Sequence, residues 1–199
     1  MNNEPNSSRR ILDAALQLFS EKGYEATSTR EICELAGITK PTLYYFYKSK
    51  EGVYRELVRN TLHELTDPVD AALSTPGPLR EKYYKFAEII FEDATRRPQL
   101  WRFIFSIVWA TTFPFRSDVH DFYNEGIRRI AEAANDAAAK GEIRQGDTEV
   151  RMLVLMGALA EALSNYLVMG RPKLTRSLAN SIIDTVFDGW SPVTTGIQA

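Results

Sequence analysis

Apolar residues recur at helical spacing along almost the whole chain. In the stretch between Ser8 and Gly23 they follow one another at intervals of three and four residues, a period typical of a helix that buries one face. Ser8 can cap the start of this helix, and Gly23 can take the left-handed conformation common at a helix end. The chain shows no sustained alternation of period two, the pattern that would indicate a strand. The pattern therefore predicts an all-α protein of about nine helices.

Prolines and glycines divide the rest of the chain into further helical segments. We expect helices at about residues 49–65, 79–97, 99–112, 119–140, 148–169 and 174–190. The first two of these helices are predicted to be separated by Pro68 and by the Ser-Thr-Pro-Gly-Pro run at 74–78. The resulting organisation is a head at residues 1–52, a helical body at 53–191 and a frayed tail at 192–199.

Two short helices and a tight turn are predicted within residues 27–47. Ser28 and Glu31 have the spacing of a capping box, in which each side chain accepts from the other residue's backbone N–H. Gly37 suits a turn that requires the left-handed conformation. Thr39 caps the next helix, and Pro41 falls in its first turn, where the missing N–H has no cost. This spacing predicts a helix-turn-helix whose second helix enters a DNA major groove.

The side chains of this segment indicate how the two short helices pack. We expect the first helix to bury Ile32, Cys33 and Leu35, with Cys33 as a small packing residue rather than a nucleophile. Ile38, Leu43 and Phe46 can then join the second helix to the first. Tyr47 needs a partner for its hydroxyl if it is buried.

Composition and charge narrow the class of protein. The chain has 199 residues, with 44% hydrophobic and 25% charged residues, as in ordinary globular proteins. Its net charge of −2 argues against a protein that coats nucleic acid. Residues 38–50, however, carry three lysines and no acid, a strip that suits a focused phosphate contact. A solvated basic face is the alternative.

The motifs resemble the tetracycline-repressor (TetR/AcrR) family of transcription regulators. The resemblance rests on residues 27–32 (TSTREI), 36–47 (AGITKPTLYYFY) and 49–51 (SKE), together with the helix at 11–24. One departure is the order Phe46-Tyr47, where Tyr-Phe is more usual. The resemblance implies an all-helical homodimer whose two heads read a two-fold symmetric operator in double-stranded DNA.

The same resemblance assigns roles within the head. The exposed front of the second helix, with candidates for base and backbone contact, comprises Thr39, Lys40, Pro41, Thr42 and Tyr45. Tyr44 and Lys50 match positions that grip phosphates, and Ser28 and Thr29 begin a helix whose N–H and hydroxyl groups can bind a phosphate. For Tyr44 and Tyr45 the alternative is an ordinary core or surface aromatic.

The last two predicted helices are candidates for a dimer interface. A four-helix interface between two copies, as the resemblance implies, would use Leu155, Leu159, Leu163, Tyr166, Ile182, Val186 and Phe187. The competing interpretation places these residues in an intramolecular core.

Residues 100–123 are unusually rich in aromatic side chains. Aromatic-lined cavities with few polar groups suit apolar or flat ligands. The predicted pocket residues are Phe86, Ile90, Trp101, Phe105, Trp109, His120, Tyr123, Met156 and Asn165. The alternative is that this aromatic stretch is plain core.

These observations predict a ligand-responsive regulator, most simply a repressor that a small apolar or aromatic molecule releases from DNA. An enzyme is disfavoured because no nucleophile or nucleotide-binding motif is found, and we expect no cofactor and no metal site. A protein-interaction module without DNA binding is a second alternative, and activation is a variant. The polar N-terminus and single cysteine indicate a cytoplasmic protein with no membrane contact.

Overall fold

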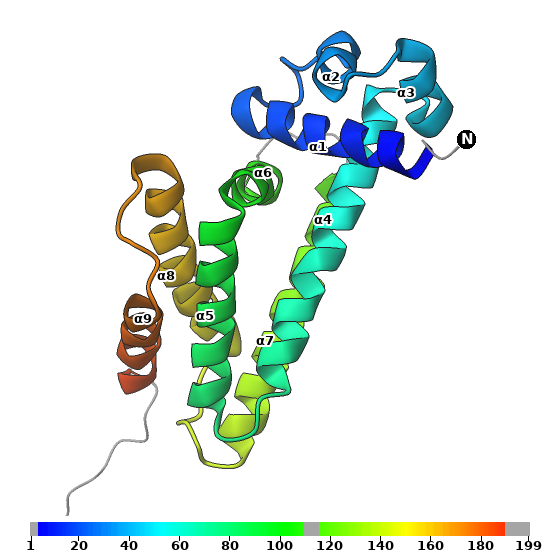
Figure 1. Ribbon diagram of the computed structural model, residues 1–199. Coiled ribbons are helices and arrows are strands. Elements are labelled where there is room, and N and C mark those ends of the chain that lie inside the picture. Colours follow the sequence, from blue (N-terminus) through cyan, green and yellow to red (C-terminus); the bar gives the residue numbers. More distant parts are fainter. Residues whose placement is uncertain (1–3, 110–115, 190–199) are drawn as a thin grey trace, which may run out of the picture. The chain divides into compact units, whose positions relative to one another are not determined.

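The computed structural model describes residues 4–109 and 116–189, without the side chains of residues 4–5, 65 and 116–123. Within these residues it contains nine helices and no strand, which confirms the all-α fold (Figure 1). The helices are α1 (Glu4–Lys22), α2 (Thr29–Ala36), α3 (Lys40–Tyr47), α4 (Lys50–Leu73), α5 (Leu79–Arg96), α6 (Pro98–Val108), α7 (Arg116–Ala139), α8 (Thr148–Met169) and α9 (Arg176–Asp188). The predicted tail at 192–199 lies outside the described residues.

The chain divides into two compact units. Unit 1 comprises Met1–Glu64 with Arg97–Phe122, and unit 2 comprises Leu65–Arg96 with Tyr123–Ala199. Unit 1 therefore holds α1–α3, the first part of α4, and α6. The predicted boundary at residue 52 separates a DNA-binding head from a ligand-binding body. It is a division by function, which the two compact units do not test, and it remains a prediction.

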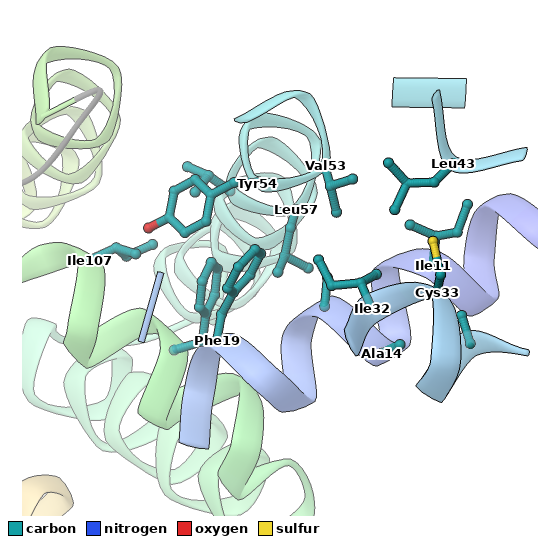
Figure 2. Close-up of a cluster of buried hydrophobic side chains, with 14 of the residues drawn as sticks. Ile11, Ala14, Phe19, Ile32, Cys33, Leu43, Val53, Tyr54, Leu57 and Ile107 are labelled. Carbon is teal, nitrogen blue, oxygen red and sulfur yellow. The ribbon is translucent and has the colours of Figure 1, made fainter. Parts of the chain in front are cut away.

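The core of unit 1 is a single cluster to which five helices contribute (Figure 2). Its fully buried members include Ile11, Ala15 and Phe19 of α1, Ile32 of α2, Leu43 of α3, Val53 and Tyr54 of α4, and Phe103 of α6. Burial raises the pKa of Tyr54 far above its usual range. The first turns of α4 are thus part of the same core that holds α2 and α3.

One expectation for α2 was wrong. Leu35 is 48% exposed, and Ala36 is buried in its place beside Ile32 and Cys33. Residues 32, 33 and 36 lie on one side of a helix with 3.6 residues per turn, whereas residue 35 lies at the edge of that side.

Unit 2 is built around α5, which packs against α8 and α9. Tyr83 is fully buried, and its hydroxyl donates to the Ile130 carbonyl at 2.9 Å while its ring meets Phe187 edge-on. Arg80 of α5 forms an ion pair with Asp184 of α9 at 3.1 Å. Both contacts fix α5 within the unit.

Two helix boundaries differ from the prediction. The first helix begins at Glu4, so Ser8 lies inside it rather than at its cap. α4 continues through Pro68 to Leu73. A proline inside a helix removes one hydrogen bond, but Val69 and Ala72 are buried beyond it, and this packing favours continuing the helix.

Candidate nucleic-acid interface

The start of α2 is closed by a complete capping box. Ser28 Oγ accepts from the Glu31 N–H, and Ser28 donates to Glu31 Oε2 both through its N–H at 2.9 Å and through its hydroxyl at 2.8 Å. Glu31 also forms an ion pair with Lys22. These donors lower the pKa of Glu31 from 4.5 to about 2, with the Lys22 hydrogen bond as the largest cause.

This arrangement bears on the predicted phosphate contact of Ser28. Both donors of Ser28 are directed at the carboxylate of Glu31, which carries the charge that a phosphate would bring. Thr29, the first residue of α2, is half-buried beside it. The roles of Ser28 and Thr29 remain predictions. A phosphate could accept from Ser28 only if it displaced the Glu31 carboxylate.

The turn between α2 and α3 is held by its own backbone and by one long side chain. Gly37 has φ +61°, and its N–H bonds to the carbonyls of Cys33 and Glu34. Arg10 of α1 donates to the Gly37 carbonyl at 2.9 Å. The predicted left-handed turn is confirmed, and α1 stabilises it through Arg10.

α3 is anchored on one side and exposed on the other. Leu43 is fully buried. At the start of the helix Thr39 accepts from the Thr42 N–H, and the two hydroxyls lie 2.9 Å apart. Tyr44 is 44% exposed and Tyr45 is 65% exposed.

Most of the residues predicted to contact DNA share this outer side. Thr39, Lys40, Pro41, Tyr44 and Tyr45 are exposed, and Thr42 is half-buried. The helix therefore presents hydroxyls, an ammonium group and two phenol rings together. These groups can donate to phosphates and to base edges in a major groove.

Tyr47 at the end of α3 has the hydroxyl partner that its position requires. Its hydroxyl lies 2.7 Å from Ser8 Oγ and 3.2 Å from the Ser8 carbonyl. Burial raises the pKa of Tyr47, and the Ser8 bond lowers it by a smaller amount. Ser8, predicted as a helix cap, instead joins α3 to α1.

Lys50 is the first residue of α4, but its ammonium group is directed toward the protein's own backbone. Nζ donates at 2.9 Å to the carbonyls of both Tyr24 and Thr27. It also lies 4.2 Å from the centre of the Tyr24 ring. A phosphate contact by Lys50 remains a prediction, and these contacts compete with it.

The other charged groups of the head differ in how they are held. Arg30 forms an ion pair with Glu34 at 2.7 Å. Lys22 forms an ion pair with Glu31. Lys40 is exposed at the start of α3. Lys48, which caps the end of α3, is also exposed. Positive charge is thus displayed at both ends of α3.

The predicted pocket residues belong to both units. In unit 1, Trp101 is buried, and Phe105 stacks on Trp109 with ring centres 4.5 Å apart. In unit 2, Phe86 and Ile90 are buried and Met156 is half-buried. Asn165 is half-buried and donates to Glu161 Oε1 at 2.6 Å. His120 and Tyr123 lie in the part of α7 whose side chains are outside the described residues.

The predicted dimer residues divide into two groups. Five of them are buried within the chain itself: Leu155, Leu159, Leu163, Val186 and Phe187. Tyr166 and Ile182 are half-buried. The five buried side chains pack inside their own unit and leave little surface for a partner, so a dimer contact by them stays a prediction beside the intramolecular core.

α8 carries other apolar residues on its exposed side. Leu153 is 68% exposed and Val168 is 79% exposed, and Val150, Val154 and Met169 are also exposed. Only a third of the most apolar 18 residues of α8 is buried, and its length and hydropathy would also suit a membrane span.

Three residues have roles in the head that the sequence analysis did not assign to them. Arg10 supports the turn at Gly37, Ser8 holds Tyr47, and Gly52 allows α4 to approach α3 closely. The glycine was the one detectable hint, because a glycine in the first turn of a helix indicates either a special conformation or a close approach.

The chain is similar to known regulators of transcription. Residues 11–57 match the family described as bacterial regulatory proteins, tetR family. Over 146 residues the chain is 24% identical to the uncharacterized HTH-type transcriptional regulator YhgD of Bacillus subtilis (strain 168), covering 73% of this chain and 76% of that protein.

Solved structures show the same fold over nearly the whole length. The fatty acid degradation regulator FadR of Bacillus halodurans gives a TM-score of 0.80 at 19% identity, covering 92% of this chain and 95% of that one. The transcriptional regulator FadR of Bacillus subtilis, solved in complex with stearoyl-CoA, gives 0.78 at 18% identity, covering 91% and 98%.

Proposed function

We propose that this chain, whose residues 11–57 match the bacterial tetR family of regulators, represses transcription as a homodimer bound to a two-fold symmetric operator. A small apolar molecule then releases it from the DNA. The observation that carries the proposal is the exposed outer side of α3, with Lys40, Tyr44 and Tyr45 displayed on a helix that Leu43 anchors in the core.

On this proposal the outer side of α3 enters the major groove. Tyr45, the more exposed tyrosine, and Thr39 with Lys40 at the helix start reach base edges, while Tyr44 donates to a phosphate. The two heads of a dimer then read half-sites one helical turn, or a multiple of it, apart.

The exposed side of α8 is our proposed dimer face, in place of the buried residues of the same helix. Val150, Leu153, Val154 and Val168 follow one another along one stripe, which also holds Gly157, where an added Cβ would meet nothing within 4 Å. A small residue in an apolar stripe permits close approach of a second helix. Glu161, hydrogen-bonded to Asn165, lies in the middle of the stripe. A charged residue at this point is costly in lipid but tolerable at a protein interface, so we propose a second copy of the chain as the occupant.

The proposed effector is apolar or aromatic, and we propose that some of the predicted pocket residues bind it. Two observations support this: the pocket candidates include a buried aromatic residue in each unit, Trp101 and Phe86, and a regulator of the same fold was solved with stearoyl-CoA. A ligand can release the DNA only by binding more tightly to the conformation that does not fit the operator.

We also propose a cytoplasmic location, where the operator DNA and the effector are available. The single cysteine, Cys33, is buried and free, as is usual in a reducing compartment.

The proposal can be tested by fluorescence anisotropy with the full chain. The probe is DNA from immediately upstream of the gene, compared with a scrambled duplex of equal length. Specific regulators prefer their site by roughly 10³-fold or more. Tyr45→Ala should reduce this preference, and Lys140→Ala, which removes an exposed charge from unit 2, serves as a control that should leave it unchanged.

Effector release is tested in the same titration. Stearoyl-CoA is added as an apolar probe, with coenzyme A as the control that lacks the acyl chain. Loss of DNA binding with stearoyl-CoA alone would support an apolar effector. A folded dimer that binds neither duplex would refute the proposed function and favour a protein-interaction module.

A further inference from the structure

The ammonium group of Lys50 is held by two backbone carbonyls and an aromatic ring of the protein. A lysine ammonium has three N–H donors. Two of them reach the Tyr24 and Thr27 carbonyls, each at 2.9 Å, and the group also lies over the face of the Tyr24 ring at 4.2 Å. A phosphate contact by this group would have to compete with these interactions.

The partners of Lys50 belong to the turn that joins α1 to α2. Thr27 is buried, with its N–H bonded to the Tyr24 carbonyl at 3.2 Å and its hydroxyl to the Gly23 carbonyl at 2.8 Å. The carbonyls of a tight, partly buried turn need donors, and Lys50 supplies two. The turn immediately precedes Ser28, the cap of α2.

The Tyr24 ring extends this contact into the core. It packs edge-on against Tyr54 of α4 with ring centres 4.8 Å apart, and its ring is tilted against that of Phe19 of α1 at 5.7 Å. Lys50 and Tyr54 lie one helical turn apart at the start of α4. The first two turns of α4 therefore contact the α1–α2 turn through the ammonium group of Lys50 and the ring of Tyr54.

We propose that Lys50 is a positioning residue, which holds the α1–α2 turn on the start of α4 and so sets the angle at which α2 and α3 are presented to DNA. Its charge neutralises backbone dipoles of the protein and no phosphate. The inference deepens the proposed function, on which it rests: a change in α4 is transmitted to the DNA-reading helices at this contact.

Salt dependence separates a positioning role from a phosphate contact. Each phosphate neutralised by a cation contributes about 0.9 to the slope of log K against log salt, so a phosphate contact made by both heads of a dimer contributes about 1.8. Lys50→Met removes the ammonium group and keeps an unbranched apolar side chain. Lys40→Met is the matched control, since Lys40 is exposed at the front of α3 in the same unit.

The experiment measures the affinity of the full-length variants for the upstream duplex and for a random duplex at several salt concentrations, below the temperature at which any variant unfolds. For Lys50→Met we expect upstream binding to weaken on the order of tenfold, as for one lost base contact, with an unchanged slope on both duplexes. Because phosphate contacts act on all sequences alike, affinity for the random duplex should also hardly change. Lys40→Met should lower the slope. A slope reduced by Lys50→Met as much as by Lys40→Met overturns the proposal.

A second measurement needs no DNA and remains decisive if the wild-type protein prefers no duplex, an outcome that would count against the proposed function alone. Amide hydrogen exchange of the free protein is followed in peptides that cover residues 24–36. Lys50→Met should speed exchange there at least severalfold while leaving unit 2 unchanged, and Lys40→Met should not. Exchange as slow as in the wild type would show that Lys50 does not hold the turn.

Discussion

The junction between α3 and α4 leads to the sharpest prediction, because one backbone atom leaves no room for a side chain. A Cβ added at Gly52 would lie 1.8 Å from the Tyr47 carbonyl oxygen and 3.0 Å from its carbonyl carbon. These are backbone atoms, so no rotamer change relieves the contact. The substitution Gly52→Ala therefore forces α4 away from the end of α3.

The size of the effect follows from the geometry. Contacts of a Cβ shorter than 3.0 Å are essentially never seen, so the two segments must separate by about 1.2 Å. Val53 and Tyr54, next to Gly52, are fully buried in the core of unit 1, and the movement disturbs their packing. Overpacking of this kind costs about 1–3 kcal/mol, and the higher helix propensity of alanine offsets about 1 kcal/mol. We expect a rigid backbone contact to fall at the upper end, with a net loss of about 2 kcal/mol.

Urea unfolding followed by circular dichroism measures this loss. With a slope of about 2 kcal/mol/M, the unfolding midpoint of unit 1 should fall by about 1 M. Gly126→Ala is the matched control, because Gly126 lies inside α7 and a Cβ there would meet nothing within 4 Å. There the same substitution should stabilise by about 1 kcal/mol. If both variants shift the midpoint upward, α4 does not approach Tyr47 as closely as the structure shows, and the reasoning is refuted.

Three further predictions concern single contacts. Tyr47→Phe removes the bond to Ser8 and should destabilise unit 1 by about 0.5–1.5 kcal/mol in urea unfolding; an unchanged midpoint would contradict the contact. Because the folded pKa of Glu31 is about 2 and its usual value is 4.5, its stabilising effect should be complete above pH 4.5 and be lost as pH falls toward 2. Thermal unfolding of Glu31→Gln should lack that part of the acid dependence, and identical pH profiles would argue against the capping box. Leu153→Glu places a charge on the exposed side of α8 and should yield folded monomers in sedimentation, whereas an intact dimer would exclude this face.

Local structure in the head could be predicted from the sequence because its causes lie within a few residues. The capping box at Ser28 and Glu31, the left-handed Gly37 and the cap at Thr39 each depend on neighbours three or four positions away. Their side chains meet their backbone partners in any helix of that sequence. Leu35 shows the limit, since which edge of a short helix is buried depends on what packs against it.

The body was less predictable because α8 is apolar on more than one side. Leu155 and Leu159 are buried, whereas Leu153 and Val154, which directly precede them in the same helix, are exposed. A helix that is apolar all round shows no preferred face in its periodicity. Which of its apolar residues are buried therefore depends on the packing of α5 and α9 against α8.

Taken alone, the sequence determined the all-α class and the positions of most helices, because these follow from periodicity and from caps that act over one turn. Its motifs also carried the resemblance of the head to the tetR family, whose model matches residues 11–57. Tertiary structure alone decided the partners of Lys50, Arg10 and Tyr47, which lie 23 to 39 residues away along the chain. It also decided that Gly52 touches the Tyr47 carbonyl. A hydrogen bond or a steric contact depends on distances of a few tenths of an ångström between separate elements, and only the packing of those elements sets such distances.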